Sequence, residues 1–128
     1  MKILSAKKYG VKLKATIQAT GKLGFTKATS DALLFAERKY IKFSQSEDES
    51  NLFLSVSSEP DEDAFKLSIS SGYYSLNTKA LFDALSFNYE DSTVIFDLHR
   101  AASFDEELQG EAYKMVPRIT KKEKNMDS

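Results

Sequence analysis

Residues 26–35 read TKATSDALLF, and residues 78–87, which lie 52 positions later, read TKALFDALSF. Seven of the ten paired positions are identical, and similarity at a fixed spacing is the sequence signature of a repeated structural unit. The preceding segments also correspond, because Gly21–Phe25 (GKLGF) precedes the first copy as Gly72–Leu76 (GYYSL) precedes the second. The sequence therefore predicts one structural unit that occurs twice.

Each ten-residue copy is expected to form a short helix. Thr26 in the first copy and Asn77 before the second are suitable N-caps, because their side-chain oxygens can accept the free amide hydrogens of a first helical turn. Helices this short are stable only when other parts of the protein pack against them. The residues expected to face the core are Ala28, Ala32 and Leu33 in the first helix and Ala80, Leu81, Ala84 and Leu85 in the second.

Strands are predicted on both sides of each helix. Val11–Gln18 and Phe65–Ser70 alternate between apolar and polar residues, a period of two that is typical of a half-buried strand. Pro117 cannot donate a backbone hydrogen bond, so it indicates a sheet edge or a strand end. The other predicted strands are Lys22–Phe25, Tyr40–Gln45, Leu52–Ser57, Tyr73–Leu76, Thr93–Leu98 and Ala112–Val116.

The predicted fold class is α+β, mostly β, with two pseudo-symmetric strand–strand–helix–strand–strand halves forming one domain. The halves span about residues 11–58 and 64–117, the domain spans 1–118, and the polar residues 119–128 are expected to be a disordered tail. Each half offers one apolar sheet face and one short helix, so both halves are needed to close a core. A chain of 128 residues is of the usual size for a single domain.

Composition excludes several classes of protein. The chain has no cysteine, which excludes disulfides, thiol catalysis and cysteine-ligated metals. No apolar run approaches the length of about 18 residues that a membrane-spanning helix needs, and Lys2, Lys7 and Lys8 interrupt the apolar core that a secretory signal requires. We therefore expect a cytoplasmic protein with no membrane partner.

The lysines near the N-terminus form the candidate binding site. Residues 1–27 contain seven lysines and no acidic residue, although the whole chain carries a net charge of −1. Such a local basic region can attract a polyanion whatever the total charge. Lysine is also a common solvated residue on strand edges, where it discourages aggregation, and that alternative remains open. The candidate nucleic-acid-binding residues are Lys7, Lys8, Lys12, Lys14, Lys22 and Lys27.

No set of residues predicts catalysis. His99 is the only histidine in the chain, so no second histidine or cysteine completes a metal site or a nucleophile–base pair. The carboxylates of residues 47–49, 61–63 and 105–107 fall in predicted turns, without the spacing of a calcium loop. Isolated Gly21 and Gly72 do not form a phosphate-binding loop. We expect no cofactor, no metal and no enzymatic activity.

The two units resemble the AbrB/MazE swapped-hairpin family. The likeness rests on Gly21–Phe25 with its basic Lys22, on a short helix ending at Leu33-Leu34-Phe35, and on two strands joined by a charged turn. It covers Val11–Ser57 and again Phe65–Val116, so one chain would imitate the family's intertwined dimer. The resemblance implies a regulator or antitoxin that binds DNA.

The sequence thus predicts a small, non-enzymatic interaction module with a regulatory role. In the leading hypothesis it contacts nucleic-acid backbone through the N-terminal lysines, because positive groups in a line suffice to bind phosphates. In the alternative it binds another protein and no nucleic acid. The oligomeric state stays open.

Overall fold

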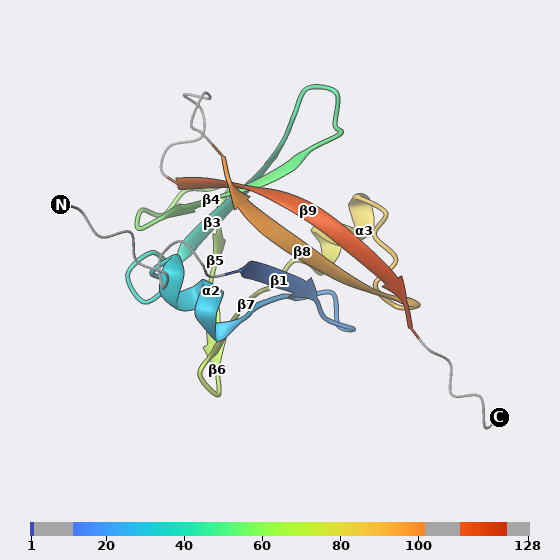
Figure 1. Ribbon diagram of the computed structural model, residues 1–128, viewed down its shortest axis with the longest axis horizontal. Coiled ribbons are helices and arrows are strands. Elements are labelled where there is room, and N and C mark those ends of the chain that lie inside the picture. The colour runs from blue at the N-terminus through green and yellow to red at the C-terminus, as the bar shows by residue number, and fades with distance from the viewer. Residues whose placement is uncertain (2–11, 102–110, 123–128) are drawn as a thin grey trace.

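The computed structural model of this protein describes Met1 and residues 12–101 and 111–122. Figure 1 shows a molecule built mainly of strands, with two short helices. In chain order the elements are strands β1 (Leu13–Ile17) and β2 (Leu23–Phe25), helix α2 (Lys27–Ala32), strands β3 (Tyr40–Gln45), β4 (Leu52–Ser57), β5 (Phe65–Lys66), β6 (Ser68–Ser70) and β7 (Tyr73–Leu76), helix α3 (Lys79–Ala84), and strands β8 (Ser92–Arg100) and β9 (Glu111–Lys121).

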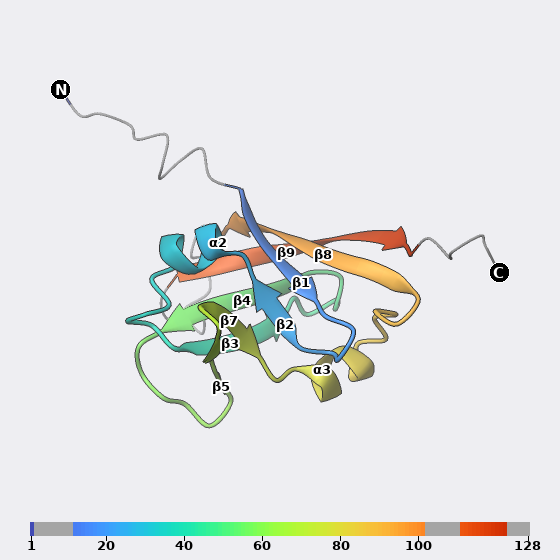
Figure 2. The ribbon, with the colours of Figure 1, turned by 90° about the horizontal axis from the view of Figure 1, so that it is seen from below.

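The strands form one nine-stranded sheet in the order β5-β3-β4-β9-β8-β1-β2-β7-β6. Every neighbouring pair is antiparallel. The two edge strands follow one another in the chain, because β5 ends at Lys66 and β6 begins at Ser68. The sheet therefore curls until it is nearly closed. Figure 2 shows β8 and β9 on one side of the curled sheet and β3 and β7 on the other.

The predicted α+β fold of two strand–strand–helix–strand–strand halves is wrong. Strands account for 47% and helices for 12% of this mostly β structure. Strands from the two predicted halves also alternate within one sheet, since β1 pairs with β8, β2 with β7 and β4 with β9. The physical reason is that each helix has only six residues and buries too little apolar surface to form a layer of its own. The strands must therefore supply the core.

The core lies on the inner face of the curled sheet. Strand alternation supplies most of it, and Ala15, Ile17 and Leu23 show the expected inward positions of β1 and β2. Phe82 of α3 is fully buried and stacks on Phe96 of β8, with ring centroids 5.9 Å apart. Other fully buried side chains are Leu33, Phe35, Ile41, Leu54, Leu76 and Val94.

The helices bury different residues from those expected. Ala28 and Ala32 are exposed, and the buried members of α2 are Thr29 and Ser30. In α3 Ala80 and Ala84 are exposed and Phe82 is buried. The prediction of burial is more accurate for the residue that follows each helix, since Leu33 is fully buried and Leu85 is partly buried. Small alanines point outward because the larger Phe82 and the hydrogen-bonding Thr29 fill the space beside the sheet.

The helix caps match the expectation in one copy only. The Thr26 hydroxyl accepts the backbone N–H of Thr29 at 3.1 Å, which is the predicted N-cap of α2. The N-cap of α3 is Thr78 instead of Asn77, and its side chain makes no capping hydrogen bond. Its hydroxyl contacts the β1–β2 turn instead, accepting the N–H of Leu23 at 3.0 Å and donating to the Gly21 carbonyl at 3.1 Å.

The two copies end their helices in the same way. Leu34 and Ser86, which are equivalent in the sequence repeat, both have positive φ angles, 57° and 63°. One residue later, Phe35 N–H donates to the Ser30 carbonyl at 3.0 Å, and Phe87 N–H to the Phe82 carbonyl at 3.1 Å. A left-handed residue of this kind ends a helix, so the repeated sequence encodes a repeated local turn.

The segment with the clearest strand pattern, Phe65–Ser70, is not one strand. It divides at Leu67 into β5 and β6, which lie at opposite edges of the sheet. Leu67 is buried and its N–H donates to the Lys39 carbonyl at 2.8 Å, whereas Ile69 is 60% exposed. Alternation predicted which residues are extended, but it could not show that their partners change at Leu67.

The C-terminal prediction is also corrected. Ile119, Thr120 and Lys121, which were expected in a disordered tail, continue β9 and pair with Val94, Thr93 and Ser92. Lys122 follows β9, and its N–H donates to the Asp91 carbonyl at 3.0 Å. Residues 123–128 of that predicted tail lie outside the described residues.

Pro117 lies within β9 and not at its end. It is opposite Phe96 of β8, while the pairing of β9 with β4 stops two residues earlier at Met115. Among the described strands Pro117 therefore has a neighbour on one side only, and this agrees with the edge position that a missing donor predicts.

Candidate nucleic-acid interface

The β1–β2 hairpin places three of the candidate lysines on its outer face. Residues that alternate with them, such as Ala15 and Leu23, are buried. Successive side chains of a strand point to opposite faces, so Lys12, Lys14 and Lys22 face away from the core. Lys12 and Lys22 are exposed, and Lys14 is half-buried.

The hairpin separates Lys22 from the other lysines along its length. Lys22 lies at the turn, where its carbonyl accepts the Gln18 N–H at 2.7 Å. Lys14 lies four residues from Gln18, which corresponds to roughly 13 Å along a strand. Lys27 is at the opposite end from Lys22, because α2 begins there and its Thr29 hydroxyl accepts the Lys14 N–H at 2.8 Å. Lys12, Lys14 and Lys27 thus lie toward the same end of the hairpin, and Lys7 and Lys8 lie outside the described residues.

Two further cations join this face from β9. Lys14 is opposite Asp97 of β8, and Arg118 of β9 binds Asp97 through Nε at 2.6 Å and Nη2 at 3.2 Å. Lys114 occupies the same face of β9, opposite the exposed His99. The hydrogen bond from Arg118 lowers the pKa of Asp97 below its ordinary value, and the charges of Lys14 and His99 act in the same direction.

The sequence did not single out Lys114 and Arg118. They lie about 100 residues from Lys14 in the chain and share a face with it only because β8 stands between β1 and β9. Their alternation with Met115 and Pro117 along a strand was visible in the sequence. The order of strands, which alternation does not reveal, was the missing information.

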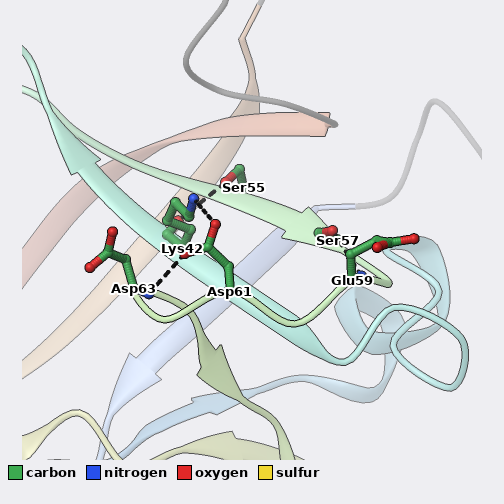
Figure 3. A network of polar contacts seen from close by, with 6 residues as sticks. All are labelled: Lys42, Ser55, Ser57, Glu59, Asp61 and Asp63. Atoms are coloured by element: carbon green, nitrogen blue, oxygen red, sulfur yellow. Dashed lines mark hydrogen bonds and ion pairs between the residues drawn. The ribbon is translucent and has the colours of Figure 1, made fainter.

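The carboxylate clusters have structural contacts. Figure 3 shows Lys42 of β3 reaching Asp61 in the segment after β4, with Nζ and Oδ2 2.7 Å apart. Asp61 also accepts the Asp63 N–H at 2.8 Å, so it fixes its own turn. The Lys42 hydrogen bond lowers the pKa of Asp61, and the same bond raises the pKa of Lys42. This network holds the exposed 58–63 segment against β3.

The acidic β3–β4 turn is ordered by serines. Asp48 accepts hydrogen bonds from the hydroxyls of Ser46 at 2.6 Å and Ser50 at 2.7 Å. These bonds lower the pKa of Asp48 to about 2, Ser46 first and then Ser50. Within the described residues no group of three or more histidines and carboxylates could hold a metal ion. The third cluster, residues 105–107, lies outside the described residues.

Among the helices of the described residues, none is long and apolar enough to cross a membrane. Comparison of the chain with models of protein families, with curated proteins and with solved structures finds no match. The resemblance to the AbrB/MazE family therefore stays a prediction from the sequence.

Proposed function

We propose that this protein is a non-enzymatic interaction module of the cytoplasm, with a regulatory role, which binds nucleic-acid backbone through the outer face of β2, β1, β8 and β9. The observation that carries the proposal is the uneven charge of that face. Its described cations are Lys12, Lys14, Lys22, Lys114 and Arg118, and Asp97 is the carboxylate that the described residues place among them.

Binding of this kind needs little more than positive charge at a suitable spacing. Lysine ammonium groups attract phosphates without reading bases, and binding releases the counterions that surround a nucleic acid. Bidentate arginine contacts are the usual means of reading guanine, and Arg118 already uses its Nε and Nη2 on Asp97. The proposal is therefore for binding that is nearly independent of base sequence and strongly dependent on salt.

The test is a fluorescence anisotropy titration with duplex and single-stranded oligonucleotides at several salt concentrations. On a double-logarithmic plot, duplex affinity should fall with a slope of about −0.9 for each phosphate neutralised. The triple variant Lys12→Gln, Lys14→Gln, Lys22→Gln should flatten that slope by roughly two to three such units. The matched control changes three exposed lysines to glutamine and removes the same charge: Lys39 before β3, Lys66 in β5 and Lys79 in α3.

Two results would contradict the proposal: no binding at low salt, and binding that the two triple variants weaken equally. Either would leave the alternative, a protein that binds another protein and no nucleic acid.

A further inference from the structure

Within the described residues, the strand β9 has no partner beyond Met115 on the side that faces β4. It pairs with β8 along its length, but with β4 only from Glu111 to Met115. Lys122 N–H donates to the Asp91 carbonyl at 3.0 Å, and Ala101 N–H to the Ala112 carbonyl at 2.9 Å. In an antiparallel ladder the direction of these groups alternates, so the even-numbered residues of β9 bond to β8 and the odd-numbered ones face away from it.

Pro117 explains where the second ladder stops. It occupies the next odd-numbered position after Met115, where a partner strand would need an N–H donor that proline lacks. Beyond it, Ile119 and Lys121 present both N–H and C=O groups on that side. Among the described strands, none pairs with this edge. In the part of the chain that the structure describes, the backbone of these two residues is thus unpaired on this side.

A hollow lined by both apolar and polar side chains opens beside this edge. It has a volume of about 160 Å³ and lies between the β3–β4 turn, the segment after α3, and β9. Ile119 continues the same face of β9 two residues beyond Pro117 and is 60% exposed. The residues lining the hollow are Gln45, Glu49, Ser50, Leu52, Leu85, Phe87, Phe96, Met115 and Pro117.

The unpaired part of β9 and the hollows at its two ends form one surface, whose ends differ in charge. Glu49 borders the hollow, and the same turn holds Glu47 and Asp48, so residues 46–51 carry three carboxylates and no cation. At the far end a second hollow, of about 720 Å³, contains Ile119 and Lys121. There Lys122 Nζ donates to the carbonyls of Tyr89 at 3.0 Å and Glu90 at 3.2 Å. A ligand with a cation beside its apolar anchor would match the Glu49 end.

We propose that this surface binds an extended peptide of a partner protein. The peptide pairs as an additional strand with Ile119 and Lys121, inserts one apolar side chain between Leu52 and Phe87, and places a lysine or arginine beside Glu49. Strand addition of this kind obtains affinity from main-chain hydrogen bonds and specificity from pockets for alternate side chains. Four to six residues separate the hollow from Lys121 along β9, so a peptide of about six extended residues reaches both, at roughly 3.3 Å per residue.

The experiment begins with a displayed library of random nine-residue peptides selected on the intact protein. Counter-selection uses the variant Ile119→Lys, which should fold because Ile119 is exposed. The matched control is Ile69→Lys, since Ile69 is equally exposed, at 60%, and lies on the edge strand β6, which does not pair with β9. The enriched peptide is then synthesised, labelled and titrated by fluorescence anisotropy against both variants and against Glu49→Lys.

We expect enriched peptides to share an apolar residue next to a basic one. Ile119→Lys should weaken binding by about tenfold or more, since it removes an apolar contact, while Ile69→Lys leaves it unchanged. Glu49→Lys should weaken binding by a few fold, as expected for an exposed charge pair. A scan of single N-methylated amides through the peptide should weaken binding at every second residue, because alternate N–H groups face β9.

Three results would overturn the proposal. The first is a selection that enriches no peptide, and the second is a peptide that binds wild type and Ile119→Lys equally. The third is a concentration-dependent dimer in sedimentation that Ile119→Lys abolishes, which would assign this edge to a second copy of the chain.

Discussion

At the scale of single residues, Thr78 joins two distant parts of the molecule. It is fully buried, and its hydroxyl serves both the Leu23 N–H and the Gly21 carbonyl of the β1–β2 turn. A larger residue would be strained at position 21, because the φ angle of Gly21 is +87° and an added Cβ would come within 2.9 Å of the Lys79 Cα. Thr78→Val keeps the shape but leaves two buried groups without a partner. We expect it to lower the free energy of unfolding by about 1–3 kcal/mol.

Urea denaturation of three variants measures this effect. Thr78→Ser keeps the hydroxyl and should lose less than Thr78→Val. Thr120→Val, an exposed position of β9, should stay within about 0.5 kcal/mol of wild type. Equal stability of Thr78→Val and Thr78→Ser would mean that the hydroxyl does not hold the turn to α3.

At the scale of elements, the sequence predicted local structure better than packing. The Thr26 cap and most strands depend on residues close in sequence, and the structure has them where capping and alternation place them. The buried face of α3 depends on what lies beneath it. Phe82 was not among the residues expected to be buried, because the alanine and leucine spacing of a six-residue helix fits more than one face.

The corrected face of α3 gives a prediction. Phe82 is fully buried against Phe43, Phe87 and Phe96, so Phe82→Ala should cost about 3–5 kcal/mol of unfolding free energy. Leu81 is its half-buried neighbour in the same helix, and Leu81→Ala should lower the free energy of unfolding clearly less. Thermal melts followed by circular dichroism compare the two variants. A larger loss for Leu81→Ala would restore the face that the sequence predicted.

At the scale of the whole molecule, the sequence shows two similar ten-residue segments but not how the strands around them pair. Pairings such as β1 with β8 join residues about 80 positions apart, and no pattern within a segment records them. The unknown strand order also explains why only part of the candidate site was predicted. Lys12, Lys14 and Lys22 were found from alternation in one hairpin, whereas Lys114 and Arg118 join their face only through the strand order.

The interleaved sheet implies that neither half of the chain folds alone. Cutting between residues 60 and 61 removes the β1–β8, β2–β7 and β4–β9 pairs together. It leaves residues 1–60 with the isolated hairpins β1–β2 and β3–β4, and isolated hairpins are at best marginally stable in water.

Fragments 1–60 and 61–128, expressed separately, should each lack a cooperative thermal transition by circular dichroism. Mixed in equal amounts they should recover one, because the cut falls in the exposed 58–63 segment and leaves every strand intact. The intact chain should unfold in one step, with coincident curves from circular dichroism and tyrosine fluorescence. A cooperative melt of either fragment alone would show that one half holds a core of its own, and the paired strands between halves would then be an interface between two folding units.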